Sequence, residues 1–101
     1  MIVETAGFVL SRNGRDAGKR FIVIGIEEEI YALIADGKTR SVDKPKRKKI
    51  KHLKPEGKIS SHISMKISSG EKITNNEIRR ALAEYSAAIG DGGNISCRKT
   101  I

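Results

Sequence analysis

The chain has 101 residues with a formal net charge of +8 at pH 7, and 38% of its residues are hydrophobic. A domain of this size buries only about two thirds of its unfolded surface, so its core is modest. The single cysteine, Cys97, excludes an internal disulfide and is typical of a reducing compartment. The start has no basic leader, and no stretch approaches the ~18 apolar residues that a spanning helix needs. We therefore expect a cytoplasmic protein with no membrane segment.

Short segments rich in β-branched and aromatic residues predict four strands, each bounded by turn-forming residues. They are residues 7–12, 20–26, 30–35 and 38–42. The dipeptide Asp36-Gly37 is typical of tight turns, so we expect the last two strands to pair as a hairpin. Residues 46–53 predict a fifth, edge strand anchored by Ile50 and Leu53, with its charges facing solvent. Closing such a sheet hides its edges, so we predict a small barrel over residues 1–54.

The second half of the chain has a different character. Residues 55–73 are rich in Ser and Gly with some alternating apolar residues, which predicts a linker or a weak strand. Thr74 and Glu77 have the spacing of a capping box, so we predict a C-terminal helix over residues 74–90. Its apolar residues recur at three- and four-residue steps and form a stripe that must dock on the barrel, a partner or a second copy. The stripe consists of Ile78, Ala81, Leu82, Tyr85 and Ile89. We expect residues 91–101 to form a flexible tail.

Positive charge is concentrated between residues 40 and 58. This segment holds nine Lys or Arg residues against Asp43 and Glu56, a balance of +7, so the rest of the chain is nearly neutral. A concentrated charge attracts phosphates and releases counterions on contact. A run of lysines is also found as a merely solvated surface or tail. Here the run lies between Val42 and Leu53, two expected barrel positions, which favours a polyanion-binding surface on a folded scaffold.

Residues 9–23 read Val-Leu-Ser-Arg-Asn-Gly-Arg-Asp-Ala-Gly-Lys-Arg-Phe-Ile-Val, a hydrophobic strand, a Gly-Xaa-Asp-Xaa-Gly-Lys turn and a second hydrophobic strand. This segment resembles the KOW motif of ribosomal and transcription-associated proteins, with Gly18 where the motif demands glycine. A tight loop needs a residue without Cβ there, because its backbone takes positive φ. Residues 35–53 and 72–82 are similar to bacterial KOW-domain RNA-binding proteins related to large-subunit ribosomal proteins of archaea and eukaryotes. The resemblance implies an SH3-like five-stranded barrel that binds RNA in connection with the ribosome.

Two groups of site residues follow from the resemblance and the charge pattern. The loop residues expected to be structural are Asn13, Gly14, Asp16 and Gly18. We expect the carboxylate of Asp16 to order the turn by accepting hydrogen bonds from backbone amides. The expected RNA-binding residues are Arg12, Arg15, Lys19, Arg20, Arg40, Lys44, Lys46, Arg47, Lys48, Lys49, Lys51, His52 and Lys54. We also expect Arg79 and Arg80 of the predicted helix to extend this surface.

Such cations contact phosphates, which supplies affinity without reading the base sequence. The chain has only two Phe and two Tyr residues, all in segments that need them for the core, so base-stacking platforms are scarce. Structured RNA is therefore preferred to single strands, and the resemblance implies that this RNA is ribosomal.

Two alternative functions are compatible with the same residues. The first is a protein-interaction module of a transcription or translation complex, in which the motif loop and the predicted helix dock on a polymerase or ribosomal protein. The second is nonspecific DNA binding. We expect no catalysis, no cofactor and no metal, because His52, His62 and Cys97 lack the short paired spacing of zinc ligands. The serines of residues 60–69 likewise lack a nucleophile elbow or an acid–base set.

Overall fold

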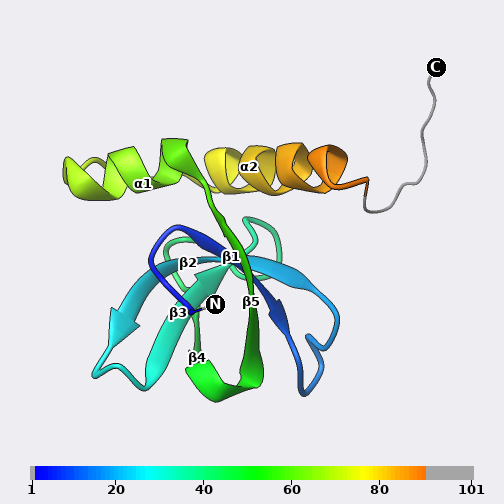
Figure 1. Cartoon of the computed structure of the whole chain (residues 1–101). Helices are drawn as coiled ribbons and strands as arrows, with labels where there is room; N and C mark the ends of the chain where they lie inside the picture. Colours follow the sequence, from blue (N-terminus) through cyan, green and yellow to red (C-terminus); the bar gives the residue numbers. More distant parts are fainter. Residues whose placement is uncertain (1, 91–101) are drawn as a thin grey trace.

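A five-stranded antiparallel sheet lies beneath two helices in the computed structural model, which describes residues 2–90 (Figure 1). The elements in chain order are β1 (Gly7–Ser11), β2 (Arg20–Glu27), β3 (Tyr31–Ala35), β4 (Lys46–Lys49), a 3-10 turn η1 (Ile50–His52), β5 (Leu53–Ile59), α1 (Ser61–Ser68) and α2 (Asn75–Ala88). The prediction of a small, mainly β domain is confirmed. No helix within the described residues is long and apolar enough to cross a membrane.

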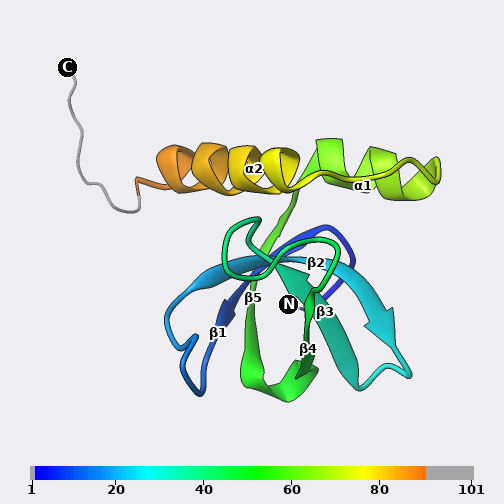
Figure 2. The ribbon, with the colours of Figure 1, turned by 180° about the vertical axis from the view of Figure 1, so that it is seen from behind.

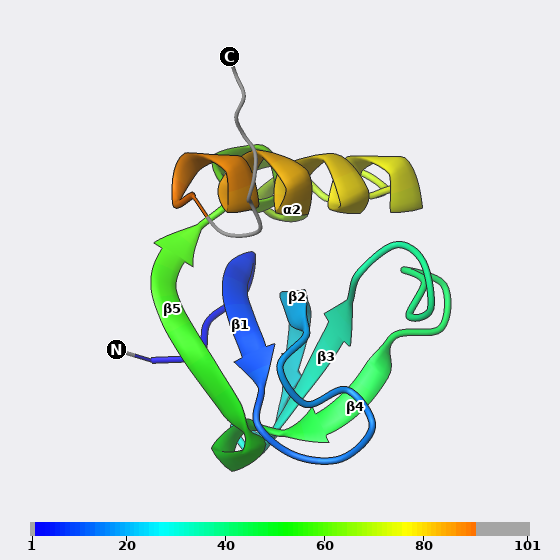
Figure 3. The same ribbon diagram turned by 90° about the vertical axis from the view of Figure 1, so that its right-hand side faces the viewer.

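The strand order in the sheet is β4-β3-β2-β1-β5, and every neighbouring pair is antiparallel. The two edge strands, β4 and β5, are consecutive in the chain and are joined only by η1. Figure 3 shows how the sheet curves so that this short turn spans the distance between them. The pairing of β2 with β3 shifts register between Val23 and Gly25, an irregularity of the kind that bends a strand and increases its twist.

The sheet buries side chains on both of its faces. Phe8 and Ile22 lie on the face covered by the helices, where they pack with Ile63 of α1 and Ile78 of α2. The opposite face carries a second core cluster, whose members are Val9, Phe21, Val23, Ala32, Ile34 and Leu53. Burial on both faces explains why the β2 sequence is a nearly continuous apolar run instead of an alternating one.

The predicted strand over residues 38–42 is wrong. The carboxylate of Asp36 accepts hydrogen bonds from the backbone amides of Lys38 and Arg40, both at 2.8 Å, and from the hydroxyl of Thr39 at 3.0 Å. Such local side-chain bonds offer the backbone an alternative to strand pairing. The segment is therefore a loop that reaches from the sheet toward α2 (Figure 2), and β3 pairs with β4 instead.

The prediction of one edge strand over residues 46–53 is also corrected. That stretch divides into β4 and the start of β5, because η1 turns the chain between them. Residues 55–73 are not a linker: β5 continues to Ile59, and α1 follows with Ser60 as its N-cap, whose hydroxyl accepts a hydrogen bond from the amide of Ile63 at 3.3 Å. Ile63 and Ile67 are four residues apart and both pack on the helix-covered core, so their spacing is helical.

Helix α2 begins where the capping box predicts. The Thr74 hydroxyl accepts a hydrogen bond from the Glu77 amide at 3.2 Å, and the Glu77 carboxylate accepts one from the Thr74 amide at 2.9 Å. Four residues of the predicted apolar stripe, Ile78, Ala81, Leu82 and Tyr85, pack in the helix-covered core, whereas Ile89 follows the helix and is 48% exposed. The ring of Tyr85 stacks on that of Phe8 with centroids 4.2 Å apart. The helix ends at Ala88, so it is not the C-terminal segment of the chain. The predicted tail over residues 91–101 lies outside the described residues.

Candidate nucleic-acid interface

The motif loop between β1 and β2 is closed by backbone hydrogen bonds at its base. The amide of Ser11 donates to the carbonyl of Lys19 at 3.0 Å, and the amide of Gly18 donates to the carbonyl of Ser11 at 2.8 Å. The φ angle of Gly18 is +83°, as expected for the motif glycine. A Cβ at Gly18 would have no atom within 4 Å, so the requirement for glycine comes from backbone conformation and not from crowding.

Asp16 differs from its predicted role. Its side chain is buried, and its carboxylate accepts a hydrogen bond from the guanidinium of Arg40 at 3.0 Å instead of from backbone amides. The loop between β3 and β4 begins at Asp36 and is called the Asp36 loop below. It turns Arg40 back toward the motif loop, so Arg40 gives Asp16 a stronger, charge-assisted partner. The ammonium of Lys19 lies 4.0 Å from the same carboxylate. Asp16 thus ties two loops together through Arg40.

Two hydrogen-bonded contacts bring the motif loop beside the basic segment. The amide of Arg12 donates to the carbonyl of His52 in η1 at 2.9 Å. The ammonium of Lys48 in β4 donates to the carbonyl of Asn13 at 2.8 Å and to the hydroxyl of Ser11 at 2.7 Å. Segments far apart in sequence therefore share one end of the sheet (Figure 3).

The four consecutive cations of β4 divide between two faces. Lys46 and Lys48 lie opposite buried residues of β3, so they share the face that carries the second core cluster. Arg47 and Lys49 point the other way because successive side chains alternate along a strand. This division was not apparent from the charge run, since it depends on the register with β3.

Arg47 is held on its face by two neighbours. Its guanidinium lies 3.7 Å from the centroid of the Tyr31 ring, and its Nε donates to the Glu27 carboxylate at 2.7 Å. The Glu27 carboxylate raises the pKa of Arg47, although exposure to solvent keeps such a pair weak. Arg47 therefore presents a partly neutralised charge to any polyanion.

The predicted RNA-binding cations differ in their access to solvent. The exposed residues are Arg12, Arg15, Lys19, Lys44, Lys46, Arg47, Lys49, Lys51 and Lys54. The half-buried residues are Arg20, Arg40, Lys48 and His52. Arg20 is the most enclosed of those with an ion pair: its side chain is 12% exposed, its Nε donates to the Glu56 carboxylate at 2.5 Å, and its guanidinium lies 5.1 Å from the centroid of the Tyr85 ring. Arg20 thus joins the sheet to α2.

Lys38 is a cation that sequence reasoning missed. It lies at a hollow of about 540 Å³ between the end of the motif loop, the Asp36 loop and α2, together with Lys19 and Arg79. The guanidinium of Arg79 donates to the carbonyl of Gly37 at 2.5 Å, which holds the loop against the helix. No local signal identified Lys38, because residues 38–42 were predicted to be a strand.

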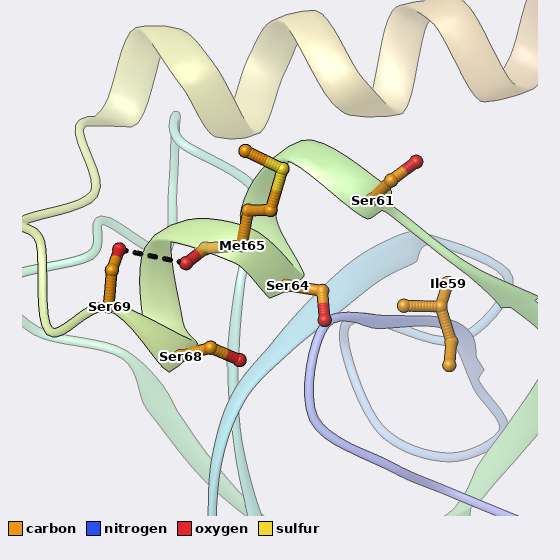
Figure 4. Close-up of a pocket in the computed structure, with 6 residues that line it drawn as sticks. All are labelled: Ile59, Ser61, Ser64, Met65, Ser68 and Ser69. Carbon is orange, nitrogen blue, oxygen red and sulfur yellow. Dashed lines mark hydrogen bonds between the residues drawn. The ribbon is translucent and has the colours of Figure 1, made fainter.

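A second hollow, of about 560 Å³, differs from the first in having no charged lining residue (Figure 4). It lies beside α1, where the side chain of Met65 is 70% exposed and that of Ile59 is 40% exposed. The remaining lining residues are Ser61, Ser64, Ser68 and Ser69, and the hydroxyl of Ser69 donates to the carbonyl of Met65 at 2.9 Å. The exposed methionine gives this hollow an apolar and conformationally adaptable surface.

Within residues 2–90, no group of three His, Cys, Asp or Glu side chains is arranged to hold a metal ion. Cys97 lies outside the described residues. The two histidines belong to different elements. His52 lies in η1, whereas the imidazole of His62 in α1 lies 2.6 Å from the Glu77 carboxylate. The described part of the chain thus presents surfaces of charge and not a cluster of ligands.

Comparison with protein-family models and with curated proteins finds no match to this chain. The resemblance to the KOW motif therefore stays a prediction from residues 9–23 and their neighbours. The charges and contacts of the motif loop and the basic segment are what support a function.

Proposed function

We propose that this protein binds structured RNA, above all ribosomal RNA, as a cytoplasmic ribosomal or ribosome-associated protein. The observation that carries the proposal is the junction of the motif loop with the basic segment. Lys48 and the amide of Arg12 hold these two segments together at one end of the sheet. Exposed cations from both segments can then contact phosphates on more than one stretch of backbone.

We further propose that the sheet is an SH3-like barrel of the KOW type. The strand order, with the two edge strands joined by η1, supports this architecture. The bonds from Lys48 to Ser11 and Asn13 support it too, because they link edge strand β4 to the end of β1 across the open side of the sheet. In this proposal the barrel is the rigid base that fixes the spacing of the phosphate contacts.

The state of the aromatic residues favours structured RNA over single strands. Phe8 and Tyr85 stack on each other, Phe21 is buried, and Arg47 covers the Tyr31 ring. All four rings are therefore engaged within the fold, whereas single-strand binders keep rings available for bases. Contacts to phosphates and to the shape of a folded RNA are what the remaining exposed side chains can supply.

Charge reversal at exposed positions tests the proposal. The double variant Lys46→Glu/Lys51→Glu should weaken binding to a large-subunit ribosomal RNA fragment by about 100-fold at fixed salt, since each reversal removes a phosphate contact and adds repulsion. The matched control is Lys58→Glu/Lys72→Glu, which makes the same change in net charge at exposed positions: Lys72 precedes α2, and Lys58 is the one cation of the basic segment near the end of β5 that pairs with the start of β1, opposite to the motif loop. Unchanged affinity of the first variant, or equal losses in both, would overturn the proposal.

The salt dependence of binding tests the contact with phosphates, and sedimentation tests the association with the ribosome. The log–log salt slope of RNA binding should be about −0.7 to −0.9 per phosphate contact. The protein should sediment with large ribosomal subunits at low salt and leave them at high salt. Equal affinity for duplex DNA of the same length would indicate nonspecific DNA binding instead.

The second candidate function is a protein-interaction module, and the exposed Met65 beside α1 is the observation that favours it. Ile78, Ala81, Leu82 and Tyr85 of the apolar stripe pack in the core and only Ile89 is exposed, so α1 is the better docking surface. In this case Met65→Asp should abolish association with the ribosome, and the association should be nearly indifferent to salt because apolar contacts carry it.

A further inference from the structure

We infer that the hollow between α2, the motif loop and the Asp36 loop, called the groove below, is a second phosphodiester site. It holds one strand of an RNA duplex, while the exposed cations of β4 and η1 hold the other. This inference rests on the proposed function and names the form of RNA that it prefers. It concerns residues outside the basic segment, and the groove has its own cations and its own walls.

Besides Arg20, which is paired with Glu56, three cations line the groove, and they come from separate elements. Lys19 ends the motif loop, Lys38 belongs to the Asp36 loop, and Arg79 lies on α2. All three are exposed at the hollow of about 540 Å³. That volume lies within the range of about 300–1,000 Å³ typical of ligand sites, which is ample for a nucleotide unit of a backbone. Three convergent cations at a concave surface raise the local concentration of phosphate.

Two carboxylates lie beside these cations, and both are engaged within the protein: that of Asp16 is paired with Arg40 and lies 4.0 Å from the ammonium of Lys19, and that of Asp36 is bonded within its own loop. Asp36 accepts hydrogen bonds from the amides of Lys38 and Arg40 and from the hydroxyl of Thr39. Burial acts to raise the pKa of Asp36, but these hydrogen bonds outweigh it and lower the pKa, so the carboxylate stays ionised. Its oxygens point at their donors, and the groove keeps a positive balance.

The walls of the groove are fixed before any ligand arrives. A Cβ at Gly37 would lie 2.5 Å from the carbonyl oxygen of Asn75, so the loop approaches α2 as closely as only glycine allows. The amide of Val42 donates to the side-chain oxygen of Asn75 at 2.8 Å, and Arg79 bonds the carbonyl of Gly37. The ion pair of Asp16 with Arg40 joins this loop to the motif loop.

Four residues of α2 line the groove, and two of them, Ala83 and Ser86, are small; the other two are Arg79 and Leu82. Ala83 and Ser86 line it one turn and two turns after Arg79, at the spacing of a single helix face. Their short side chains leave room for a backbone strand to lie along the helix. The motif loop contributes Lys19 to this groove and the carbonyl of Asn13 to the Lys48 contact, so one loop borders both phosphate sites. Contact with two backbone strands is the way proteins recognise A-form RNA by shape.

A charge inserted into the groove wall tests the inference. Ala83→Glu places a carboxylate among the three cations, and it should weaken binding of the full chain to a short RNA hairpin by about tenfold. The matched control is Ala88→Glu on another face of α2, which makes the same change in charge on the same helix. It should change affinity less than about twofold, since it touches no expected contact. Both positions are exposed, so thermal unfolding should show both variants folded.

A second variant reports the contact directly. Lys38→Ala should reduce the magnitude of the salt slope for the hairpin by about 0.7 to 0.9, the value for one phosphate contact, and should leave weaker binding to an unstructured oligonucleotide unchanged. If Ala83→Glu and Lys38→Ala bind the hairpin like the parent while Lys46→Glu/Lys51→Glu binds weakly, the groove inference is overturned and the proposed function stands. If none of these variants affects RNA binding, both are overturned.

Discussion

Two sets of basic residues serve opposite purposes in this molecule. Arg20, Arg40 and Lys48 point at acceptors within the protein, and each joins elements that are distant in sequence. Lys46 and Lys51 are exposed and form no ion pair within residues 2–90. Some basic residues thus stabilise the fold, whereas others face solvent. Both kinds occur within one strand, since β4 contains Lys46 and Lys48.

Positive charge is available to a polyanion only where no acceptor of the protein itself already engages the cation. A cation that is enclosed with its acceptor contributes to the native state, and its charge is already largely compensated. An exposed cation contributes little to stability but keeps its charge for a polyanion. A count of charges along the chain therefore overstates the binding surface by including residues such as Arg20, whose partner Glu56 lies on β5.

The strongest way to test this division is to remove Arg20. The variant Arg20→Met leaves the Glu56 carboxylate without a cation, with the Tyr85 hydroxyl 3.5 Å away as a remaining donor, in a site where the Glu56 side chain is only 13% exposed. Breaking an enclosed pair from one side should lower the free energy of unfolding by about 3 kcal/mol, measured by urea denaturation. The exposed control Lys46→Met should change it by less than about 0.5 kcal/mol. A loss below about 1 kcal/mol for Arg20→Met would contradict the structural role.

Lys48 and Lys46 offer a sharper comparison, because they lie two residues apart on one face of β4. Lys48→Met should lower the free energy of unfolding by about 1.5 kcal/mol, since it removes charge-assisted hydrogen bonds to Ser11 and Asn13. Lys46→Met should leave stability unchanged and weaken RNA binding. Urea denaturation and RNA titration on both variants would measure the two effects. Equal stability losses for the pair would show that Lys48 does not link β4 to the motif loop.

The elements that could be predicted from sequence are those whose signals are local. β1, β2 and β3 are runs of strand-forming residues that end at turn residues, and Thr74 with Glu77 marks the start of α2. The basic segment and the motif loop were also evident as patterns. Each of these features depends on residues close together in the chain.

The features that could not be predicted depend on tertiary partners. The Asp36-Gly37 dipeptide favours a hairpin, but here Gly37 lies against Asn75 of α2, and Asp36 caps its own loop. Ile63, Met65 and Ile67 alternate as in a strand, and only the core beneath α1 selects the helix, in which Ile63 and Ile67 are buried or partly buried and Met65 is exposed. The pairing of Asp16 with Arg40 joins two loops that sequence reasoning treated separately. Lys38 entered the candidate site only because its segment is a loop.

The contact between α1 and α2 extends the comparison to cations that are only partly enclosed. Hydrogen bonds from Lys66 first, then from His62 and the Thr74 amide, lower the pKa of Glu77 from 4.5 to about 2. A carboxylate whose pKa is lower in the folded state stabilises the protein fully above its ordinary pKa, and that contribution disappears as the pH falls from about 4.5 to about 2. Glu77 therefore links stability to pH in this window.

Glu77→Gln should flatten the pH dependence of the unfolding midpoint between pH 4.5 and 2, because the amide cannot titrate. At neutral pH the variant should be only slightly destabilised, since glutamine keeps the capping box with Thr74 and loses only the charge opposite Lys66. The control Glu84→Gln makes the same change in charge on α2 away from Lys66, and thermal unfolding of both across this window is the measurement. An unchanged acid slope in Glu77→Gln would mean that its contacts form equally in the unfolded chain. A flattened slope would show that the contacts of Glu77 with Lys66 and its neighbours stabilise the fold. Lys66 would then differ from Lys46, which forms no ion pair within residues 2–90 and contributes little to stability.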